Sequence, residues 1–309
     1  MKDIKLPKDC NYIAAFLTFR CSFNCSYCIN HHGGDLQKRR ELSGSDWATG
    51  LARIKTTPDL PVTLQGGEPT MHKDFYEIVG RLETRTDMDL LTNLNVNVKE
   101  FMHHVNPKAF DRDAKYASIR VSYHHGQHSF NKLLEKVMLF KKHNYNIGIW
   151  EVEHPEYRQD VLKRQSIAQT LGVDYRIKEF LGPYKGDNYG SMHYGMAVND
   201  KHLRSCLCRT NELLIGPSGD IYRCHADLYS GFNPIGNIMD ARIPELGKWR
   251  ECGRYGRCNS CDIKIKTNRF QEFGYTSVEI TNVGPAYKDN EVLDNVVNTY
   301  RKDIPTSSD

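Results

Sequence analysis

Short apolar runs alternate with amphipathic stretches along the first 185 residues. The apolar runs have the length of β-strands and occupy residues 12–19, 61–65, 89–91, 117–123, 147–152 and 175–181. Between them, apolar side chains recur three or four positions apart, as Phe75, Ile78 and Leu82 do, which predicts helices with one buried face. Six strand–helix alternations predict an α/β fold with a parallel sheet, and because eight units close a barrel, we expect a partial (β/α)6 barrel.

The alternation stops near residue 185. Residues 184–196 are rich in Gly and Tyr and are predicted to form a loop. A short apolar run at 212–215, a turn at 217–220 and a second run at 221–223 then predict a small hairpin-based module, and a strand at 276–280 and a helix at 290–301 follow. We therefore expect three parts, residues 1–185, 186–275 and 276–309.

Composition narrows the class of protein. The chain has 309 residues, of which 39% are hydrophobic and 26% charged, as is typical of a soluble globular protein. No run approaches the roughly 18 apolar residues of a membrane span, and the first residues lack the apolar stretch of a secretory signal. We expect a cytoplasmic protein without a membrane partner. The net charge of +4 is too balanced to indicate nucleic-acid binding.

The cysteines add chemistry to this picture. Of ten cysteines, three lie within residues 21–28, six within residues 206–261, and only Cys10 stands apart. In a reducing compartment, clustered cysteines are more often metal ligands or catalytic groups than disulfides. The clustering therefore predicts two metal sites.

Cys21, Cys25 and Cys28 form a C-x3-C-x2-C loop directly after the first predicted strand. A loop this tight can wrap three thiolates around one iron–sulfur cubane, leaving the fourth iron open for chemistry on a bound substrate. The alternative is a structural zinc site, which normally takes four ligands, usually as two pairs. The ligand count favours the cubane.

This loop resembles the signature of the radical S-adenosylmethionine superfamily, C-x3-C-x-aromatic-C, with Tyr27 as the aromatic residue. The resemblance implies a partial TIM-like barrel whose three thiolates hold a [4Fe–4S] cluster, with S-adenosylmethionine bound at the open iron. It also implies reductive cleavage of S-adenosylmethionine to a 5′-deoxyadenosyl radical that abstracts a substrate hydrogen. An electron donor of the flavodoxin or ferredoxin type is expected as partner.

A second motif follows the second predicted strand. Gly66, Gly67, Glu68 and Pro69 resemble the GGEP segment of that family, which binds the methionine amino group. Glycines let backbone carbonyls approach an ammonium group closely, and a carboxylate complements its charge. The resemblance therefore implies that these residues bind the cofactor.

Polar residues also end the later predicted strands. Thr92, Asn93 and Ser122 stand where family members contact the ribose or carboxylate of the cofactor, so we expect them to bind it; ordinary polar strand ends are the alternative. His124 and His125 are candidates for the substrate side, with solvent exposure as the alternative. Further charged candidates for substrate contact, with surface salt bridging as the alternative, are Glu151, Glu153, Lys178 and Glu179.

The predicted module contains six cysteines, Cys206, Cys208, Cys224, Cys252, Cys258 and Cys261. The G-x4-C unit ending at Cys224 and the later C-x2-C pair resemble the SPASM and twitch modules of radical S-adenosylmethionine enzymes. The resemblance implies one auxiliary [4Fe–4S] cluster, the twitch arrangement, on Cys224, Cys258, Cys261 and either Cys206 or Cys208. The C-x12-G spacing favours Cys206. A zinc ribbon on the same thiols is the alternative.

Cys252 is then left over. Some epimerases of this family use a free thiol to return a hydrogen atom to the substrate radical, so Cys252 is a candidate hydrogen donor. A buried structural cysteine or an alternate ligand is the other interpretation.

These features predict an oxidoreductase or epimerase that abstracts hydrogen from a small polar molecule or a peptide. The first strand begins near residue 11, which leaves no room for a leader-binding domain and favours a small molecule such as a sugar. A maturase acting on a partner-delivered peptide is the second hypothesis. A two-cluster electron carrier or a zinc-stabilised non-enzymatic protein is the rival class, but it needs neither an open iron nor the Gly66–Gly67 turn.

Overall fold

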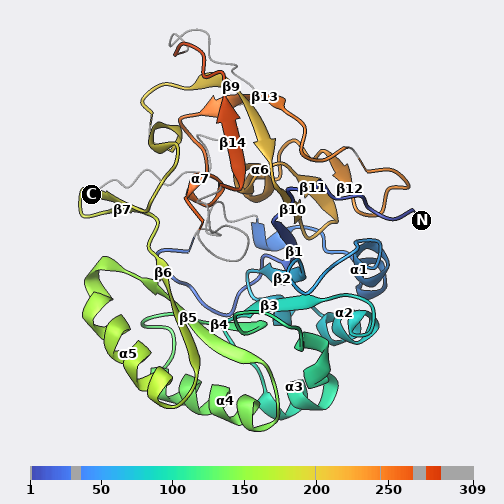
Figure 1. Ribbon diagram of the computed structural model, residues 1–309, viewed down its shortest axis with the longest axis vertical. Helices are drawn as coiled ribbons and strands as arrows, with labels where there is room; N and C mark the ends of the chain where they lie inside the picture. The colour runs from blue at the N-terminus through green and yellow to red at the C-terminus, as the bar shows by residue number, and fades with distance from the viewer. Residues whose placement is uncertain (1, 29–35, 199, 244, 267–275, 287–309) are drawn as a thin grey trace.

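The structure is a computed structural model that describes residues 2–28, 36–198, 200–243, 245–266 and 276–286. A curved α/β layer forms one half of the molecule and a smaller, strand-rich module forms the other (Figure 1). Each predicted strand of the first half is present: β1 (Tyr12–Thr18), β2 (Val62–Gly66), β3 (Met88–Thr92), β4 (Ile119–Tyr123), β5 (Ile147–Glu153) and β6 (Asp174–Glu179).

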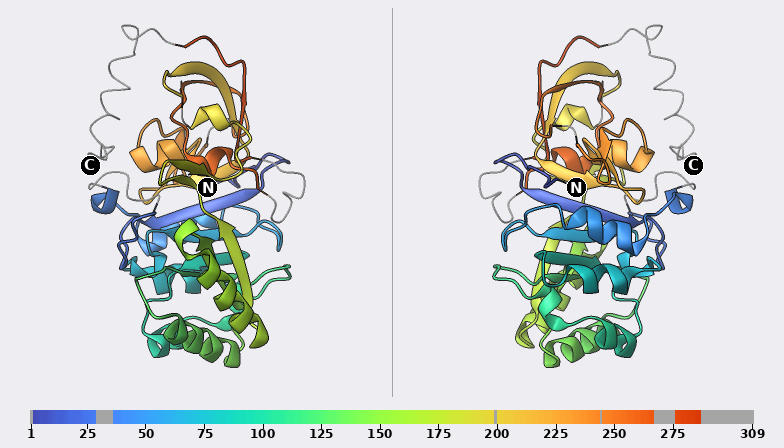
Figure 2. Two further views of the ribbon diagram at one scale, coloured as in Figure 1. Left: turned by 90° about the vertical axis from the view of Figure 1, so that its left-hand side faces the viewer. Right: turned by 90° about the vertical axis from the view of Figure 1, so that its right-hand side faces the viewer.

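Helices cover the convex side of this sheet, as the two side views also show (Figure 2). The α-helices are α1 (Gly44–Leu51), α2 (Phe75–Leu82), α3 (Val98–His104), α4 (Phe130–Lys142) and α5 (Arg158–Thr170), and the 3-10 helices are η1 (Leu36–Lys38), η2 (Pro69–Met71), η3 (Pro107–Phe110) and η4 (Pro155–Tyr157). Phe75, Phe101 and Phe140 are fully buried and join α2, α3 and α4, with ring centroids 6.2 and 5.3 Å apart. Each such side chain contributes about 2 kcal/mol by burial alone.

One nine-stranded sheet runs through both halves, in the order β12-β11-β10-β1-β2-β3-β4-β5-β6. Strands β1 to β6 pair in parallel, which confirms the predicted α/β class and partial barrel. β10 (Glu212–Ile215) pairs in parallel with the open edge of β1, and β11 (Asp220–Tyr222) and β12 (Gly236–Asn237) continue antiparallel. The predicted hairpin therefore covers the edge of the barrel sheet, whose backbone groups would otherwise lack strand partners.

The rest of the module is a three-stranded antiparallel sheet of β13 (Arg250–Tyr255), β9 (Arg204–Thr210) and β14 (Val278–Thr281), in that order. Its helices are η5 (Gly195–Ala197), α6 (His225–Ser230) and α7 (Ser260–Ile263). The predicted loop at 184–196 instead contributes to a hairpin of β7 (Gly182–Tyr184) and β8 (Asp187–Tyr189), whose turn needs Gly186 at a φ of 90°.

The predicted helix at 290–301 lies outside the described residues. Within the described part of the chain, no helix combines the length and apolar character that crossing a membrane requires.

The turn after β2 packs directly on the end of β1. Gly66 has a φ of 141°, and a Cβ there would lie 2.0 Å from the carbonyl oxygen of Thr18. A Cβ on Gly67 would lie 2.2 Å from the carbonyl oxygen of Arg20. Only glycine at both positions allows this approach, because no side chain fits against the backbone.

We expect Gly67→Ala to destabilise the protein by about 3 kcal/mol, since the new methyl group collides with backbone that is held by the sheet. The free energy of unfolding in urea measures this loss. Gly80→Ala on α2 is the matched control, because nothing lies within 4 Å of its added Cβ. This control should be neutral or stabilising by up to about 1 kcal/mol. Equal stability of the two variants would contradict the packing explanation.

Candidate functional site

The first three cysteines stand on the loop that follows β1, at the carboxyl edge of the parallel sheet. Cys25 is buried, and Cys21 and Cys28 are half-buried. The loop is turned by a hydrogen bond from the Cys28 N–H to the Cys25 carbonyl, at 3.1 Å. Burial, together with the neighbouring Cys28 and Cys21, raises the pKa of Cys25 to about 12. Metal binding at this loop must therefore displace thiol protons.

The turn after β2 is hydrogen-bonded to the residues that directly precede Cys21. The Gly67 N–H donates to the Thr18 carbonyl at 2.8 Å, and the Glu68 N–H donates to the Arg20 carbonyl at 2.7 Å. The two sequence motifs, more than 40 residues apart, are thus one structural unit.

The carboxylate of Glu68 is buried and engaged by the protein. Its Oε1 accepts from the Thr70 hydroxyl at 2.6 Å and the Thr92 hydroxyl at 2.7 Å, and its Oε2 accepts from the Asn93 N–H at 2.6 Å. Burial raises its pKa, which these donors oppose. Glu68 therefore ties the end of β2 to the end of β3, and the remaining lone pair of Oε2 is its capacity for a ligand.

Asn93 extends this network to the cysteine loop. Its Nδ2 donates to the Ser22 hydroxyl at 3.1 Å and lies 3.8 Å from the Cys21 Sγ. The structure thus brings the predicted cofactor residues Thr92 and Asn93 beside the loop. Ser122 is half-buried near the end of β4, further along the same edge of the sheet.

Aromatic side chains support the other side of the loop. The Tyr27 hydroxyl lies 3.3 Å from the His124 Nδ1, and the Phe23 ring packs edge-on against His124. Burial lowers the pKa of His124 to about 4, so its ring is neutral near pH 7. His125 stacks on Tyr157 with ring centroids 3.6 Å apart. Both histidines are therefore held by aromatic neighbours.

Gln127 is a loop-holding residue that the sequence did not reveal. Its Oε1 accepts from the Asn24 N–H at 3.1 Å, and its Nε2 donates to the Asn24 carbonyl at 3.4 Å. This amide fixes the backbone between Cys21 and Cys25 from a segment 103 residues away. No local pattern marks such a contact.

The acidic substrate candidates are occupied by the protein itself. Glu151 is buried and bound by Arg164, with Nε–Oε2 and Nη2–Oε1 distances of 3.0 and 2.6 Å. Glu153 pairs with Arg158 at 2.8 Å, and Glu179 accepts hydrogen bonds from residue 191. These three carboxylates serve the fold.

Lys178 differs from them. It lies on β6, and among the described residues no ion pair or hydrogen bond to its ammonium group is found. Burial first, and then the charges of Arg120, Lys264 and Lys266, together lower its pKa to about 7, against the opposing effect of Cys261. Lys178 is thus a desolvated cation between the barrel and the module cysteines.

The module cysteines form two groups. Cys206 and Cys208 on β9 and Cys252 on β13 bring their sulfur atoms within 4.8 Å of one another, and the Cys206 and Cys208 sulfurs are 3.5 Å apart. We call these three residues the thiol triad. Sequence spacing did not reveal that Cys252 joins the two candidates for the first ligand position.

The second group lies around the starts of two short helices. Cys224 precedes α6, Cys258 precedes α7, and Cys261 is in α7. The carboxylate of Asp262 joins the two helices, because its Oδ1 accepts from the His225 backbone N–H at 2.8 Å and lies 2.8 Å from the His225 Nδ1. Burial raises the pKa of all three thiols.

Tyr229 of α6 connects the module to the barrel. Its ring packs against Phe16 and Phe19 of the β1 segment, with centroids 6.0 and 5.9 Å apart. Burial raises the pKa of its hydroxyl, and Cys261 and Cys28 raise it further, so this phenol stands close to both cysteine regions. Figure 1 shows α6 and α7 on the module side of β1.

Comparison with known proteins agrees with this geometry. Residues 16–150, which run from β1 to β5, match the family model of the Radical SAM superfamily. The chain is 31% identical over 88 residues to a probable GTP 3′,8-cyclase of Methanopyrus kandleri, and the match covers 28% of each chain. It is 38% identical over 82 residues to the PqqA peptide cyclase of Rhodopseudomonas palustris, covering 25% of this chain and 20% of that one. The chain thus matches about a quarter of these relatives' lengths.

A solved structure shares the fold. The structure of anSMEcpe with bound AdoMet and Cp18Cys peptide superposes with a TM-score of 0.50 at 14% identity, covering 74% of this chain and 77% of that chain. The similarity therefore extends beyond the barrel.

We expect Glu68→Gln to destabilise the protein by about 1–3 kcal/mol, because the new amide cannot accept all the hydrogen bonds that the carboxylate accepts. The free energy of unfolding in urea measures this. Glu135→Gln, at an exposed position on α4, is the matched control and should change it by no more than about 0.5 kcal/mol. A Glu68→Gln variant as stable as this control would contradict the role of Glu68 in joining β2 to β3.

We expect Lys178→Met to stabilise the metal-free protein at pH 7, on the order of a few kcal/mol, because folding depresses the pKa of this lysine from its usual 10.5 to about 7. The penalty for the buried charge is complete below pH 7 and fades towards pH 10.5, so the gain should shrink at high pH. Unfolding in urea at pH 7 and pH 9.5 measures both values. Lys132→Met, exposed on α4, should show no such pH dependence.

Proposed function

We propose that this chain, which carries a radical SAM domain over residues 16–150, abstracts hydrogen from a polar substrate and catalyses its dehydrogenation or epimerisation. The observation that carries the proposal is the loop of Cys21, Cys25 and Cys28, locked by backbone hydrogen bonds to the Gly66–Gly67 turn. An electron carrier has no use for such a turn beside its cluster.

The family implies a [4Fe–4S] cluster and S-adenosylmethionine, and the residues present fit both. Three thiols on one tight loop suit three corners of a cubane and leave the fourth iron for the cofactor. When bound, the pair supplies reductive cleavage of the sulfonium, which gives a hydrogen-abstracting radical.

The chain's own residues position that cofactor. We assign the methionine end to the turn at Gly66 and Gly67, beside the carboxylate of Glu68. Thr92 and Asn93 hold this turn and the cysteine loop in register, as their hydrogen bonds show. Ser122 is the contact proposed for the far end of the cofactor.

The auxiliary [4Fe–4S] cluster is proposed for the module. Asp262 of α7 is hydrogen-bonded to His225 at the start of α6, and the sequence assigns Cys224, Cys258 and Cys261, with Cys206 or Cys208, as the ligands. A cluster there would lie beyond Tyr229 from the first loop and would accept or return the electron of the substrate radical.

A polar substrate is supported by Lys178. A desolvated cation with no described partner is costly, and an anionic or hydrogen-bond-accepting substrate group would offset that cost. A small molecule is one candidate. A peptide is the second candidate, because one relative is named a peptide cyclase and the similar solved structure contains a peptide.

Anaerobic reconstitution tests the proposal. We expect about eight irons with matching sulfide per chain and reductive cleavage of S-adenosylmethionine to 5′-deoxyadenosine. Cys25→Ser should abolish cleavage and lose about four irons, because its cubane loses a corner, while the module keeps its metal. Cys10→Ser, which removes a thiol outside both groups, should leave iron and cleavage unchanged. A protein that binds only zinc and cleaves nothing would refute the proposal.

A further inference from the structure

We propose that the ammonium groups of Lys178 in the barrel and Lys264 in the module bind an oxyanion of the substrate, a carboxylate or a phosphate, between them. We call these two residues the lysine pair. The inference rests on the proposed function and deepens it, because it names the chemical class of the substrate and adds a module residue to its binding. Neither ammonium group has an ion-pair or hydrogen-bond partner among the residues that the structure describes.

Lys178 stands at the carboxyl edge of the sheet, near the first cysteine loop. Ile177, the residue before it on β6, packs against the core beneath the helices, so Lys178 points to the opposite, concave face. Burial, and then the charges of His128 and Lys178, lower the pKa of His124. The His124 Nδ1 lies 3.3 Å from the Tyr27 hydroxyl of the cysteine loop. A group bound by Lys178 would therefore lie close to the loop assigned to radical formation.

Lys264 approaches the same place from the module. It directly follows α7, and its backbone N–H donates to the Ser260 carbonyl at 3.0 Å, where that helix ends. Burial first, and then the charges of Arg120 and Lys264, lower the pKa of Lys178, so the two ammonium groups lie close enough to repel one another. The fold thus brings two like charges together where barrel and module meet, which is unfavourable until an anion separates them.

Two further cations lie within electrostatic reach of Lys178, and both already have carboxylate partners. Arg120 pairs with Asp89 at 3.1 Å, and Lys266 pairs with Glu212. Both carboxylates are buried, so these pairs belong to the folded interior of the protein. The positive charge that this region leaves uncompensated is therefore that of the lysine pair.

Unused hydrogen-bond donors lie on the same concave face. The Arg120 Nε and the Gln65 Nε2 are buried and have no hydrogen-bond partner among the described residues. The Arg120 Nη2 donates to the Thr63 hydroxyl at 3.1 Å, and Thr63 and Gln65 are two positions apart on β2, so the three side chains share one face. A neutral polar substrate could satisfy these donors, but only an anion also compensates the lysine pair.

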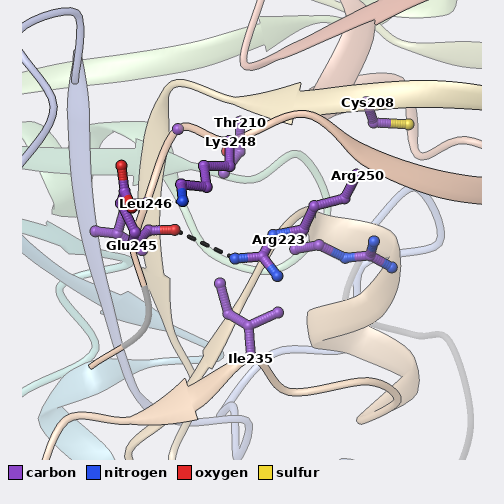
Figure 3. A pocket seen from close by; sticks show the side chains of 9 residues that line it. Cys208, Thr210, Arg223, Ile235, Glu245, Leu246, Lys248 and Arg250 are labelled. Carbon is purple, nitrogen blue, oxygen red and sulfur yellow. Dashed lines mark hydrogen bonds and ion pairs between the residues drawn. The ribbon is translucent and has the colours of Figure 1, made fainter. Parts of the chain in front are cut away.

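A cationic pocket elsewhere in the module shows the contrast. Arg223, Lys248 and Arg250 are among the residues that line it (Figure 3). Lys248 pairs with the Glu245 carboxylate at 2.6 Å, and the Arg250 Nη2 donates to the Glu245 carbonyl at 3.2 Å. The Arg223 Nη2 pairs with Asp227 at 3.3 Å. Each of these cations already has an acceptor in the protein, whereas the lysine pair has none among the described residues.

Titration calorimetry of the anaerobically reconstituted holoprotein tests the site, with the clusters oxidised so that saturating S-adenosylmethionine stays intact. The probes are acetate, inorganic phosphate and neutral acetamide, at constant ionic strength. We expect at least one oxyanion to bind about tenfold more tightly than acetamide, because only an anion forms charge-assisted hydrogen bonds with both ammonium groups. Tighter binding of acetate indicates a carboxylate substrate, and tighter binding of phosphate indicates a phosphorylated one.

The variants locate the bound oxyanion. Lys178→Met and Lys264→Met should each weaken its binding about tenfold, because each removes one of the two charges that hold it. Lys178→Arg keeps the charge and should retain binding. Lys132→Met, at an exposed position on α4, is the matched control and should bind the oxyanion as the wild type does.

The site is refuted if neither oxyanion binds, if acetamide binds as tightly as acetate, or if Lys178→Met binds the oxyanion as the wild type does. Binding that S-adenosylmethionine abolishes also refutes it, since the lysine pair would then hold the cofactor's own carboxylate. A shifted potential of the auxiliary cluster in Lys178→Met, without anion binding in the wild type, would assign the cations to that cluster instead. Failure of the proposed function is distinguishable: it abolishes S-adenosylmethionine cleavage in a protein that still binds the oxyanion, whereas cleavage without anion binding refutes this site alone.

Discussion

Two backbone hydrogen bonds between the turn after β2 and the end of β1 determine where the chemistry of this protein takes place. They join the N–H groups of Gly67 and Glu68 to the carbonyls of Thr18 and Arg20, immediately before Cys21. Side chains cannot enter this contact, so glycine is required on one side and the backbone of β1 cannot shift on the other. Because the buried Glu68 carboxylate accepts hydrogen bonds from Thr92 and Asn93, the ends of β1, β2 and β3 are joined directly beside the cysteine loop.

The barrel was predictable because its signals are local. Each buried parallel strand is a short apolar run, and each helix shows its own period, so all six strands appeared in the sequence within a few residues of their observed ends. The cysteine loop and the glycine turn are local too. The contacts that the sequence could not predict join residues far apart in the chain. They are the pairing of β10 with β1, the hydrogen bonds of Gln127 to Asn24, and the hydrogen bond from Asn93, at the end of β3, to Glu68. A residue's partner 25 or 100 positions away leaves no mark in its own neighbourhood.

The pairing of β10 with β1 also fixes the position of the module cysteines relative to the first cysteine loop. An appended module on a flexible linker would leave their separation undefined, whereas a shared sheet sets it by strand geometry. α6 follows β11 on that sheet and lays Tyr229 on Phe16 and Phe19, directly before the first cysteine loop. Packed aromatic rings exclude water and keep the local dielectric low, so charges on either side influence one another strongly. Lys178, like Tyr229, feels the charge of Cys261, and burial and the nearby cations depress its pKa.

The six module cysteines show why ligand spacing in sequence under-determines a metal site. A C-x-C pair on a strand projects both thiols to one face, whereas Cys224, Cys258 and Cys261 stand on two short helical segments that the contact of Asp262 with His225 joins. The sequence spacing of Cys206 from the later cysteines would be the same whether Cys206 stood on a strand or at the start of a helix. Cys206 pairs with Cys252, which lies 46 positions later in the sequence, and only the folded sheet brings the two together. Which thiols can act together therefore follows from the secondary structure that presents them, as much as from the number of cysteines nearby.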